Sequence, residues 1–283
     1  MFEKLPLPNS ITGKNYVAIE KIGEGSTGAV YRGYNINDTE QQHPLAIRFP
    51  TIIDTPKKRK DLIKKQAEVL QELASPHTIK YLDHCEHSIN PYLVMGYVPE
   101  TITYRIEKNT LTQKLFLQYL AQIPIILDFL RNKNKVHGDL KCGNLGIDQN
   151  KIIMLDFEST NEPGKYKLPP ENTPIYYPPE FRLYGKLTLQ SDTYTAGRNL
   201  EYMLTAQNAH SPEETFEEIE LFYDMTLPDS FKKVYLTMTN PNPALRPSPS
   251  QLTTIIQPLI DDIQIQNLFH PMQLINITLP EWF

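Results

Sequence analysis

The chain has 283 residues, 40% of them hydrophobic and 22% charged, which is enough to bury one large core or two smaller ones. A formal net charge of -5 argues against a general nucleic-acid-binding protein, because such a protein would carry a basic binding surface. The start of the chain lacks the apolar stretch of a signal peptide, and no run reaches the roughly 18 apolar residues of a membrane span. With Cys85 and Cys142 too few for a disulfide framework, we expect a cytoplasmic protein, with secretion by another route left open.

The segment KIGEGSTGAVYRG spaces three glycines as G-x-G-x-x-G, at Gly23, Gly25 and Gly28. Dinucleotide-binding folds share this spacing, but there a helix follows the glycines and receives the pyrophosphate. Here a β-branched and aromatic run at 29–35 is followed by a polar turn and an apolar run at 45–50, which predicts strand, turn and strand. Glycines at the tip of such a hairpin suit a nucleoside triphosphate, although a plain hairpin turn explains them equally well.

Two helices are predicted after these strands. Thr55 followed by Pro56 predicts the start of a helix, because threonine caps helices and proline suits their first position. Residues 111–133 carry apolar side chains close to a 3.6-residue period, which predicts one helix that Pro124 bends without ending.

The hydrophobic pattern of the sequence changes near residue 98. Short apolar runs separated by turns come before this point, and long amphipathic segments follow it. We therefore predict an α+β, bilobal fold, with a small β-rich lobe over 1–98, a larger helical lobe over 99–283, and GYVPE as the connection.

The segment KVHGDLKCGNLGID places Asp139, Lys141 and Asn144 within six residues, and KIIMLDFE brings Asp156 twelve residues after the asparagine. Two carboxylates, an amine and a carboxamide in one cleft could accept a hydroxyl proton, neutralise a phosphate and hold Mg²⁺. Each of these residues alone is usually an ordinary loop residue, so the prediction depends on their joint spacing.

Together these motifs resemble those of a eukaryotic-type protein kinase domain, from about residue 15 to about residue 265. The glycine loop, the HGDLKCGN segment and the DFE segment correspond to the family's phosphate, catalytic and metal motifs. Further matches are Val30 after the glycines, Pro179 and Glu180 at the A-P-E position, Asp192 and Gly197 at D-x-x-x-x-G, and Arg246 as partner of Glu180.

The resemblance implies ATP and Mg²⁺ as cofactors and assigns roles to the matched residues. Asp139 would orient and deprotonate the acceptor hydroxyl, Lys141 would steady the γ-phosphate, and Asn144 with Asp156 would hold the metal. The family's adenine site maps onto Val30, Ala46, Met95 as the gatekeeper, Gly96 and Val98.

The departures from the family pattern concern the phosphate anchor and its surroundings. Arg48 replaces the lysine of V-A-I-K, and Gln66 replaces the helix glutamate that normally pairs with it. We expect that in an active enzyme Gln66 holds the Arg48 guanidinium through its amide oxygen. Gly138 stands where many members carry an arginine, and Glu158 replaces the glycine of D-F-G, which is expected to stiffen the Asp156 hinge.

Three functions therefore stay open. The first is a protein Ser/Thr kinase with an atypical Arg48/Gln66 anchor, favoured by Thr173 in NTPIYYPPE. The second is a pseudokinase that acts as a nucleotide-binding or partner-binding scaffold, and the third is a small-molecule kinase of the same fold. The expected partner is a protein substrate or scaffold partner, with no nucleic acid and no membrane span, and the oligomeric state is left open.

Overall fold

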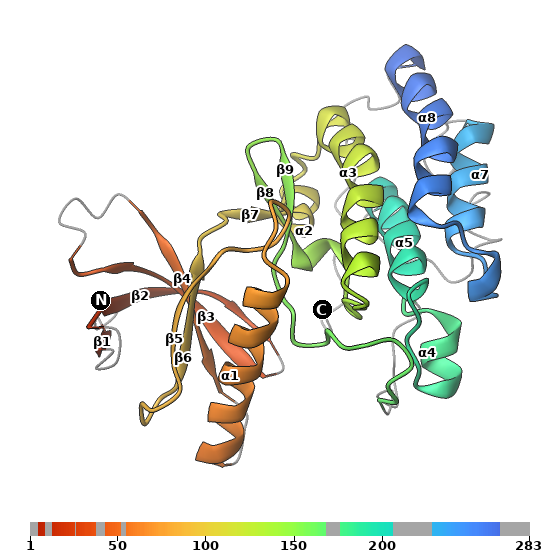
Figure 1. The fold of residues 1–283 in the computed structure, drawn as a ribbon. Helices are drawn as coiled ribbons and strands as arrows, with labels where there is room; N and C mark the ends of the chain where they lie inside the picture. The colour runs from red at the N-terminus through yellow and green to blue at the C-terminus, as the bar shows by residue number, and fades with distance from the viewer. Residues whose placement is uncertain are drawn as a thin grey trace. The chain divides into compact units, whose positions relative to one another are not determined.

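The computed structural model describes residues 5–8, 13–25, 27–37, 43–51, 55–167, 176–205 and 228–266. The chain divides into two compact units, Met1–Pro99 with Ile153–Glu158, and Glu100–Ile152 with Ser159–Phe283. The first contains an antiparallel sheet with one helix, and the second is built mainly of helices, so the fold class is α+β (Figure 1).

A six-stranded sheet forms the frame of the first unit. Its strands are β1 (Leu5–Pro8), β2 (Asn15–Glu24), β3 (Gly28–Asn35), β4 (Leu45–Pro50), β5 (Tyr81–Cys85) and β6 (Tyr92–Gly96), in the spatial order β1-β2-β3-β4-β6-β5. Every neighbouring pair is antiparallel. The two strands predicted after the glycine loop are confirmed as β3 and β4, which pair directly, and the turn between them lies partly outside the described residues.

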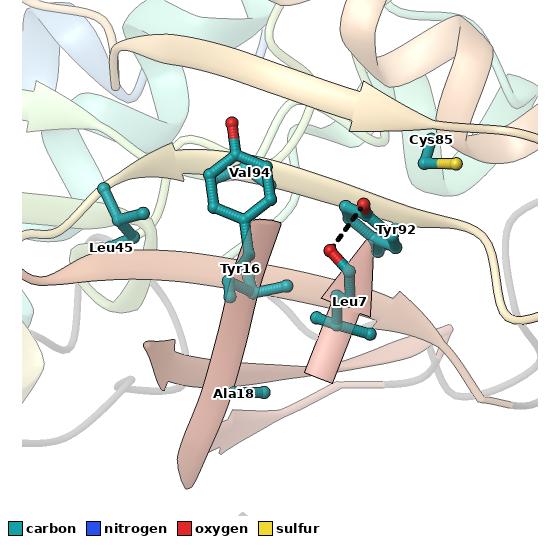
Figure 2. Packing of buried hydrophobic residues seen from close by; sticks show 8 residues of the cluster. Leu7, Tyr16, Ala18, Leu45, Cys85, Tyr92 and Val94 are labelled. Carbon is teal, nitrogen blue, oxygen red and sulfur yellow. Dashed lines mark hydrogen bonds between the residues drawn. The ribbon is translucent and has the colours of Figure 1, made fainter. Parts of the chain in front are cut away.

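One face of this sheet carries a hydrophobic core. Because side chains alternate along a strand, Leu45 and Ile47 of β4 share a face, as do Tyr92 and Val94 of β6. These four pack with Leu7, Tyr16, Ala18 and Cys85 (Figure 2). The alternation places Ala46 and Arg48 on the opposite face, away from this core.

Helix α1 (Pro56–Glu72) packs against β4, β5 and β6 and lies beside the sheet in Figure 1. The predicted start is confirmed: the Thr55 side chain accepts a hydrogen bond from the Lys58 N–H, and Pro56 occupies the first helical position. The helix buries Gln66 with its apolar residues, so an amide lies within the packed interior of this unit.

The second unit is a packed set of helices with a small sheet. The elements are α2 (Ile102–Glu107), α3 (Gln113–Asn132), α4 (Pro179–Tyr184), α5 (Ser191–Thr205), α7 (Asp229–Met238), α8 (Pro249–Gln266), the 3₁₀ turns η1 (Cys142–Asn144) and η2 (Pro243–Leu245), and the strands β7 (Glu100–Thr101), β8 (Leu145–Asp148) and β9 (Lys151–Met154). The last two residues of β9 count with the first unit. The single helix predicted over 111–133 is confirmed as α3, with Pro124 inside it.

Helix α5 is the centre of the second unit. All of its residues are buried, and it packs against α3 and α7. Helix α8 covers α3 and α7 in turn. Within the described ranges, no helix has both the length and the apolar character needed to cross a membrane.

Gly33 provides a test of the packing in the first unit. A Cβ atom there would stand 2.2 Å from the Val17 carbonyl oxygen and 2.6 Å from the Ile47 Cδ1. We expect Gly33→Ala to lower the free energy of unfolding by roughly 1–3 kcal/mol, because overpacking forces the neighbouring strand to shift. Urea denaturation followed by circular dichroism measures this loss.

The matched control is Gly23→Ala, because no atom lies within 4 Å of the Cβ position at Gly23. The free energy of unfolding should then stay within about 0.5 kcal/mol of the wild-type value. Equal losses in the two variants would show that the close approach at Gly33 is unimportant.

Candidate active site

The segment from His137 to Asn144 brings three of the predicted catalytic side chains together in the second unit. The Asn144 Nδ2 donates to the Asp139 Oδ2 at 2.8 Å and to the Asp139 carbonyl oxygen at 2.9 Å. The Lys141 Nζ lies 3.3 Å from the same Oδ2. The turn η1 fixes this arrangement, because the Asn144 N–H bonds to the Lys141 carbonyl at 2.8 Å.

Helix α5 holds the backbone of this segment. Its buried Asp192 accepts hydrogen bonds from the N–H groups of His137, at 2.7 Å, and Gly138, at 3.0 Å. The Asn199 Nδ2 donates to the Leu140 carbonyl at 2.8 Å. Gly138 has φ +77 and leaves no room for a side chain, since a Cβ there would stand 2.9 Å from the Leu187 Cδ1. The glycine that replaces the family's arginine is therefore required by the local backbone.

Two tyrosine hydroxyls bind the other oxygen of Asp139. The Tyr176 and Tyr177 hydroxyls donate to Oδ1 at 2.9 and 3.0 Å, and their rings stack with centroids 4.4 Å apart. Both residues precede α4 in the segment where the sequence singled out Thr173, which lies outside the described residues. Nothing local in the sequence indicated this contact, because Asp139 is 37 and 38 residues away.

The electrostatic surroundings of Asp139 keep its carboxyl group ionised. Burial by itself would raise the pKa, but the Lys141 charge and the Tyr176 and Tyr177 hydroxyls act more strongly, and the pKa is lowered overall. At neutral pH this side chain is therefore a carboxylate that accepts hydrogen bonds from hydroxyl groups. A substrate hydroxyl at Oδ1 would compete with the two phenols for this role.

The first unit contains the predicted glycine loop. The loop turns tightly, because the Gly25 N–H donates to the Gly28 carbonyl at 2.8 Å, and Gly23 lies opposite Val30 in the ladder of β2 and β3. A Cβ at Gly28 would stand 2.5 Å from the Phe49 carbonyl oxygen, so this position excludes side chains. Val30 in turn lies opposite Arg48 in the ladder of β3 and β4.

The residues assigned to adenine binding also lie in the first unit. Ala46 of β4 pairs with Met95 of β6, and both are buried. The Gly96 N–H donates to the Lys80 carbonyl at 2.8 Å, and Gly96 lies opposite Leu45 in the ladder of β4 and β6. Val98 follows β6 and is half-buried. Their adenine-binding role stays a prediction.

Arg48 is the most heavily bonded of the predicted site residues in the first unit. Its guanidinium, on a side chain only 9% exposed, donates from Nη1 to the Asp156 Oδ2 at 3.1 Å. The Nη2 donates to the Glu158 Oε2 at 2.7 Å and to the Thr27 Oγ1 at 2.9 Å. Thr27 also donates to Glu158, so the tip of the glycine loop joins the same network.

The predicted contact between Arg48 and Gln66 is wrong. Within the described part of the chain, neither the amide oxygen nor the amide nitrogen of Gln66 makes a hydrogen bond, although the residue is buried. Arg48 uses Asp156 and Glu158 instead, because a carboxylate forms a stronger, charge-assisted bond with a guanidinium. The sequence did carry a signal for this pairing. Compared with the family pattern, an acidic residue is missing at Gln66 and an additional one is present at Glu158.

A buried ion pair joins α4 to the segment after α7, as the sequence predicted. Arg246 bonds to Glu180 through two nitrogens, at 2.6 and 2.8 Å, and the Ser191 hydroxyl donates to the same carboxylate at 2.7 Å. This pairing fixes the start of α4, directly after the tyrosines that bind Asp139.

A glycine hairpin in a β-rich unit and an Asp-Lys-Asn loop held by a buried helix together define the protein kinase fold. The chain belongs to the family described as the protein kinase domain, whose family model matches residues 16–261. Members of this family generally use ATP and Mg²⁺.

Several characterised proteins are similar to this chain. U-box domain-containing protein 70 of Oryza sativa subsp. japonica is 30% identical over 211 residues, which cover 69% of this chain and 25% of that protein. Hormonally up-regulated neu tumor-associated kinase of Mus musculus is 28% identical over 255 residues, covering 86% and 33%. Probable serine/threonine-protein kinase MARK-A of Dictyostelium discoideum is 28% identical over 229 residues, covering 79% and 21%. The chain thus spans a third or less of the length of these relatives.

Removal of both phenol hydroxyls should change the titration of Asp139. We expect Tyr176→Phe with Tyr177→Phe to raise the pKa of this carboxyl group, because hydrogen bonds donated to the carboxylate favour its ionised form. Carboxyl ¹³C NMR of aspartate-labelled protein measures the pKa, with Asp139→Asn to assign the signal. The exposed pair Tyr166→Phe with Tyr184→Phe is the control and should leave the titration unchanged.

The same change has a consequence for stability. Because the folded-state pKa of Asp139 is lowered, its stabilising contribution is complete above the unfolded value of about 3.9 and is lost as the pH falls through the folded value. The double variant should therefore lose stability at neutral pH, and its deficit should shrink in acid. A deficit that is independent of pH, together with an unchanged titration, would contradict the role of the two hydroxyls.

Proposed function

We propose that this chain is a protein kinase that transfers the γ-phosphate of ATP, with Mg²⁺, to a serine or threonine hydroxyl of a protein substrate. The observation that carries the proposal is the geometry of Asp139. Its carboxylate is ionised, held by Lys141 and Asn144, and already bonded through Oδ1 to two hydroxyl groups. An acceptor hydroxyl needs the same contact.

The residues of the loop supply distinct functions in this reaction. Asp139 would hold the acceptor hydroxyl and take its proton as the hydroxyl oxygen bonds to the γ-phosphorus, while the bond from that phosphorus to the β-phosphate oxygen breaks and ADP leaves. Lys141, whose side chain is about half exposed, places a positive charge beside this carboxylate and steadies the transferred phosphate. The hydrogen bonds that the His137 and Gly138 N–H groups donate to Asp192 hold the loop backbone, so the orientation of Asp139 is set before a substrate binds.

The two residues proposed as metal ligands, Asn144 and Asp156, each carry an oxygen donor of the kind that suits Mg²⁺. Asn144 uses its amide nitrogen on Asp139, which leaves the amide oxygen for a metal, and Asp156 offers a carboxylate. Magnesium prefers oxygen ligands and is commonly held by one or two carboxylates together with substrate phosphates. When bound, the ion neutralises the charge on the phosphates.

The nucleotide would use the first unit. Backbone N–H groups of Gly23, Gly25 and Gly28 would approach the phosphates, because glycine leaves the backbone uncovered. Arg48 would serve as the phosphate anchor in place of the family's lysine. The adenine would lie among Val30, Ala46, Met95, Gly96 and Val98.

A specific observation favours a second function, that of a nucleotide-binding scaffold without catalysis. Two donors of Arg48 bond to carboxylates of the protein itself, and the buried Gln66 amide does not grip it. The names of the mouse and Dictyostelium relatives favour the enzyme, since both include a kinase. Measurements of transfer and of binding separate the two functions.

Loss of the Asp139 carboxylate should slow transfer strongly. We expect Asp139→Asn to lower the rate by a factor of about 100 to 10,000, the usual contribution of a general base. Radiolabelled ATP with peptide libraries that contain serine, threonine or tyrosine as the one acceptor measures both the rate and the preference. The control is Asp148→Asn, an exposed aspartate at the end of β8, which should leave the rate unchanged. Equal rates in the wild type and Asp139→Asn would refute the enzymatic proposal.

Binding of Mg·ATP is tested separately from transfer. At a nucleotide concentration of 100 times Kd, the folded state should be stabilised by about 2.7 kcal/mol. Thermal melts with Mg·ATP, with ATP and EDTA, and without nucleotide measure this, and the full shift should require the metal. A shift without transfer would support the scaffold, and no shift at millimolar nucleotide would contradict both functions.

A further inference from the structure

Glu158 occupies an unusual position for a charged side chain. It follows Asp156 by two residues, within the segment that packs with the first unit, and only 27% of its side chain is exposed. Its carboxylate lies 2.7 Å from the Nη2 of Arg48 and also accepts a hydrogen bond from Thr27. The side chain is therefore bonded to both the phosphate anchor and the glycine loop.

The charge of Arg48 requires a partner inside the first unit. A guanidinium on a residue only 8% exposed is costly to bury unless carboxylates or other acceptors face it. The neutral Gln66 cannot supply this charge, and its amide makes no hydrogen bond to the described residues. The negative charge comes from Asp156 and Glu158.

These two carboxylates are not equivalent. Asp156 is the residue assigned to Mg²⁺, and a carboxylate that ligates a metal shares its charge with that metal. Glu158 has no such assignment, so with a metal on Asp156 it would be the carboxylate left to pair with Arg48. The Nε of Arg48 forms no hydrogen bond within the described ranges and lies beside Gly28, about 3.4 Å from where a Cβ there would stand. The guanidinium thus keeps an unused donor next to the glycine loop.

We infer that Glu158 is a positioning residue, which holds the Arg48 guanidinium in the orientation that binds the nucleotide phosphates. This inference rests on the proposed function. Glu158 has taken the role that a helix glutamate has elsewhere in the family, from a different segment of the chain. The ion pair that orients the anchor is therefore formed by β4 and the segment after β9, and α1 does not contribute a charge.

The test compares Glu158→Gln, which removes the charge and keeps the shape, with Glu158→Asp, which keeps the charge on a shorter side chain. We expect Glu158→Gln to lower kcat/KM for Mg·ATP by at least about tenfold, equivalent to about 1.4 kcal/mol, and Glu158→Asp to recover part of it. The KM for ATP should rise while the KM for the peptide stays constant. The control is Glu162→Gln, which removes an exposed carboxylate 3.7 Å from Lys165 and should change neither constant.

Two further measurements show whether Glu158 acts through Arg48. In the Arg48→Gln background, Glu158→Gln should have little additional effect, because the partner that it orients is gone. The melting shift with Mg·ADP, which reports binding without transfer, should fall in Glu158→Gln and not in Glu162→Gln. Because Glu158 is partly exposed, its variants keep the test open if Arg48→Gln does not fold.

The outcomes separate this inference from the proposed function. If wild-type protein transfers phosphate no faster than Asp139→Asn, the proposed function fails and the inference fails with it. If wild-type protein is active and Glu158→Gln behaves as Glu162→Gln does, the inference alone is wrong. Tighter binding of Mg·ADP by Glu158→Gln would also overturn it, since Glu158 would then compete with the phosphates for Arg48.

Discussion

The loop that carries Asp139 depends on one interaction, the pair of hydrogen bonds from the His137 and Gly138 N–H groups to the buried Asp192. Burial raises the pKa of Asp192, although the two backbone hydrogen bonds and the nearby His137 act against this shift. Because every residue of α5 is buried, this carboxylate cannot move independently of the core of the second unit. The backbone of the loop is thus fixed by a helix that takes no part in the proposed chemistry.

The buried guanidinium of Arg48 receives its negative partners from a different segment than the family pattern predicts. A guanidinium buried on β4 must face negative charge, because an unpaired buried charge is costly. In this protein two residues of the segment after β9 supply it, and Gln66 on α1 carries an uncharged amide that makes no hydrogen bond to the described residues. Gln66 considered alone suggests that the ion pair of the phosphate anchor has been lost. Glu158 supplies the negative charge that Gln66 lacks.

The hydrogen bonds that keep Asp139 ionised also occupy both oxygens of its carboxylate. Both oxygens of the carboxylate are engaged, Oδ2 by Lys141 and Asn144, and Oδ1 by the stacked tyrosines. These contacts keep the group ionised, which a proton acceptor requires, but the tyrosines also occupy the side where a substrate hydroxyl would bind. In the proposed reaction an acceptor hydroxyl would replace a tyrosine hydroxyl at Oδ1, so one hydrogen bond to the carboxylate would be exchanged for another.

The sequence by itself determined the features that depend on neighbouring residues. The strands after the glycines, the cap of α1, the helix over 113–132 and the grouping of Asp139, Lys141 and Asn144 follow from local periodicity and short spacing. The pairing of Glu180 with Arg246 came from the family pattern. Only the tertiary structure decided that Arg48 pairs with Glu158, 110 residues away, that two tyrosines bind Asp139, and that 153–158 joins the first unit. Ion pairs and hydrogen bonds act over a few ångströms, so their partners are chosen by packing, which brings distant segments together and which no local pattern records.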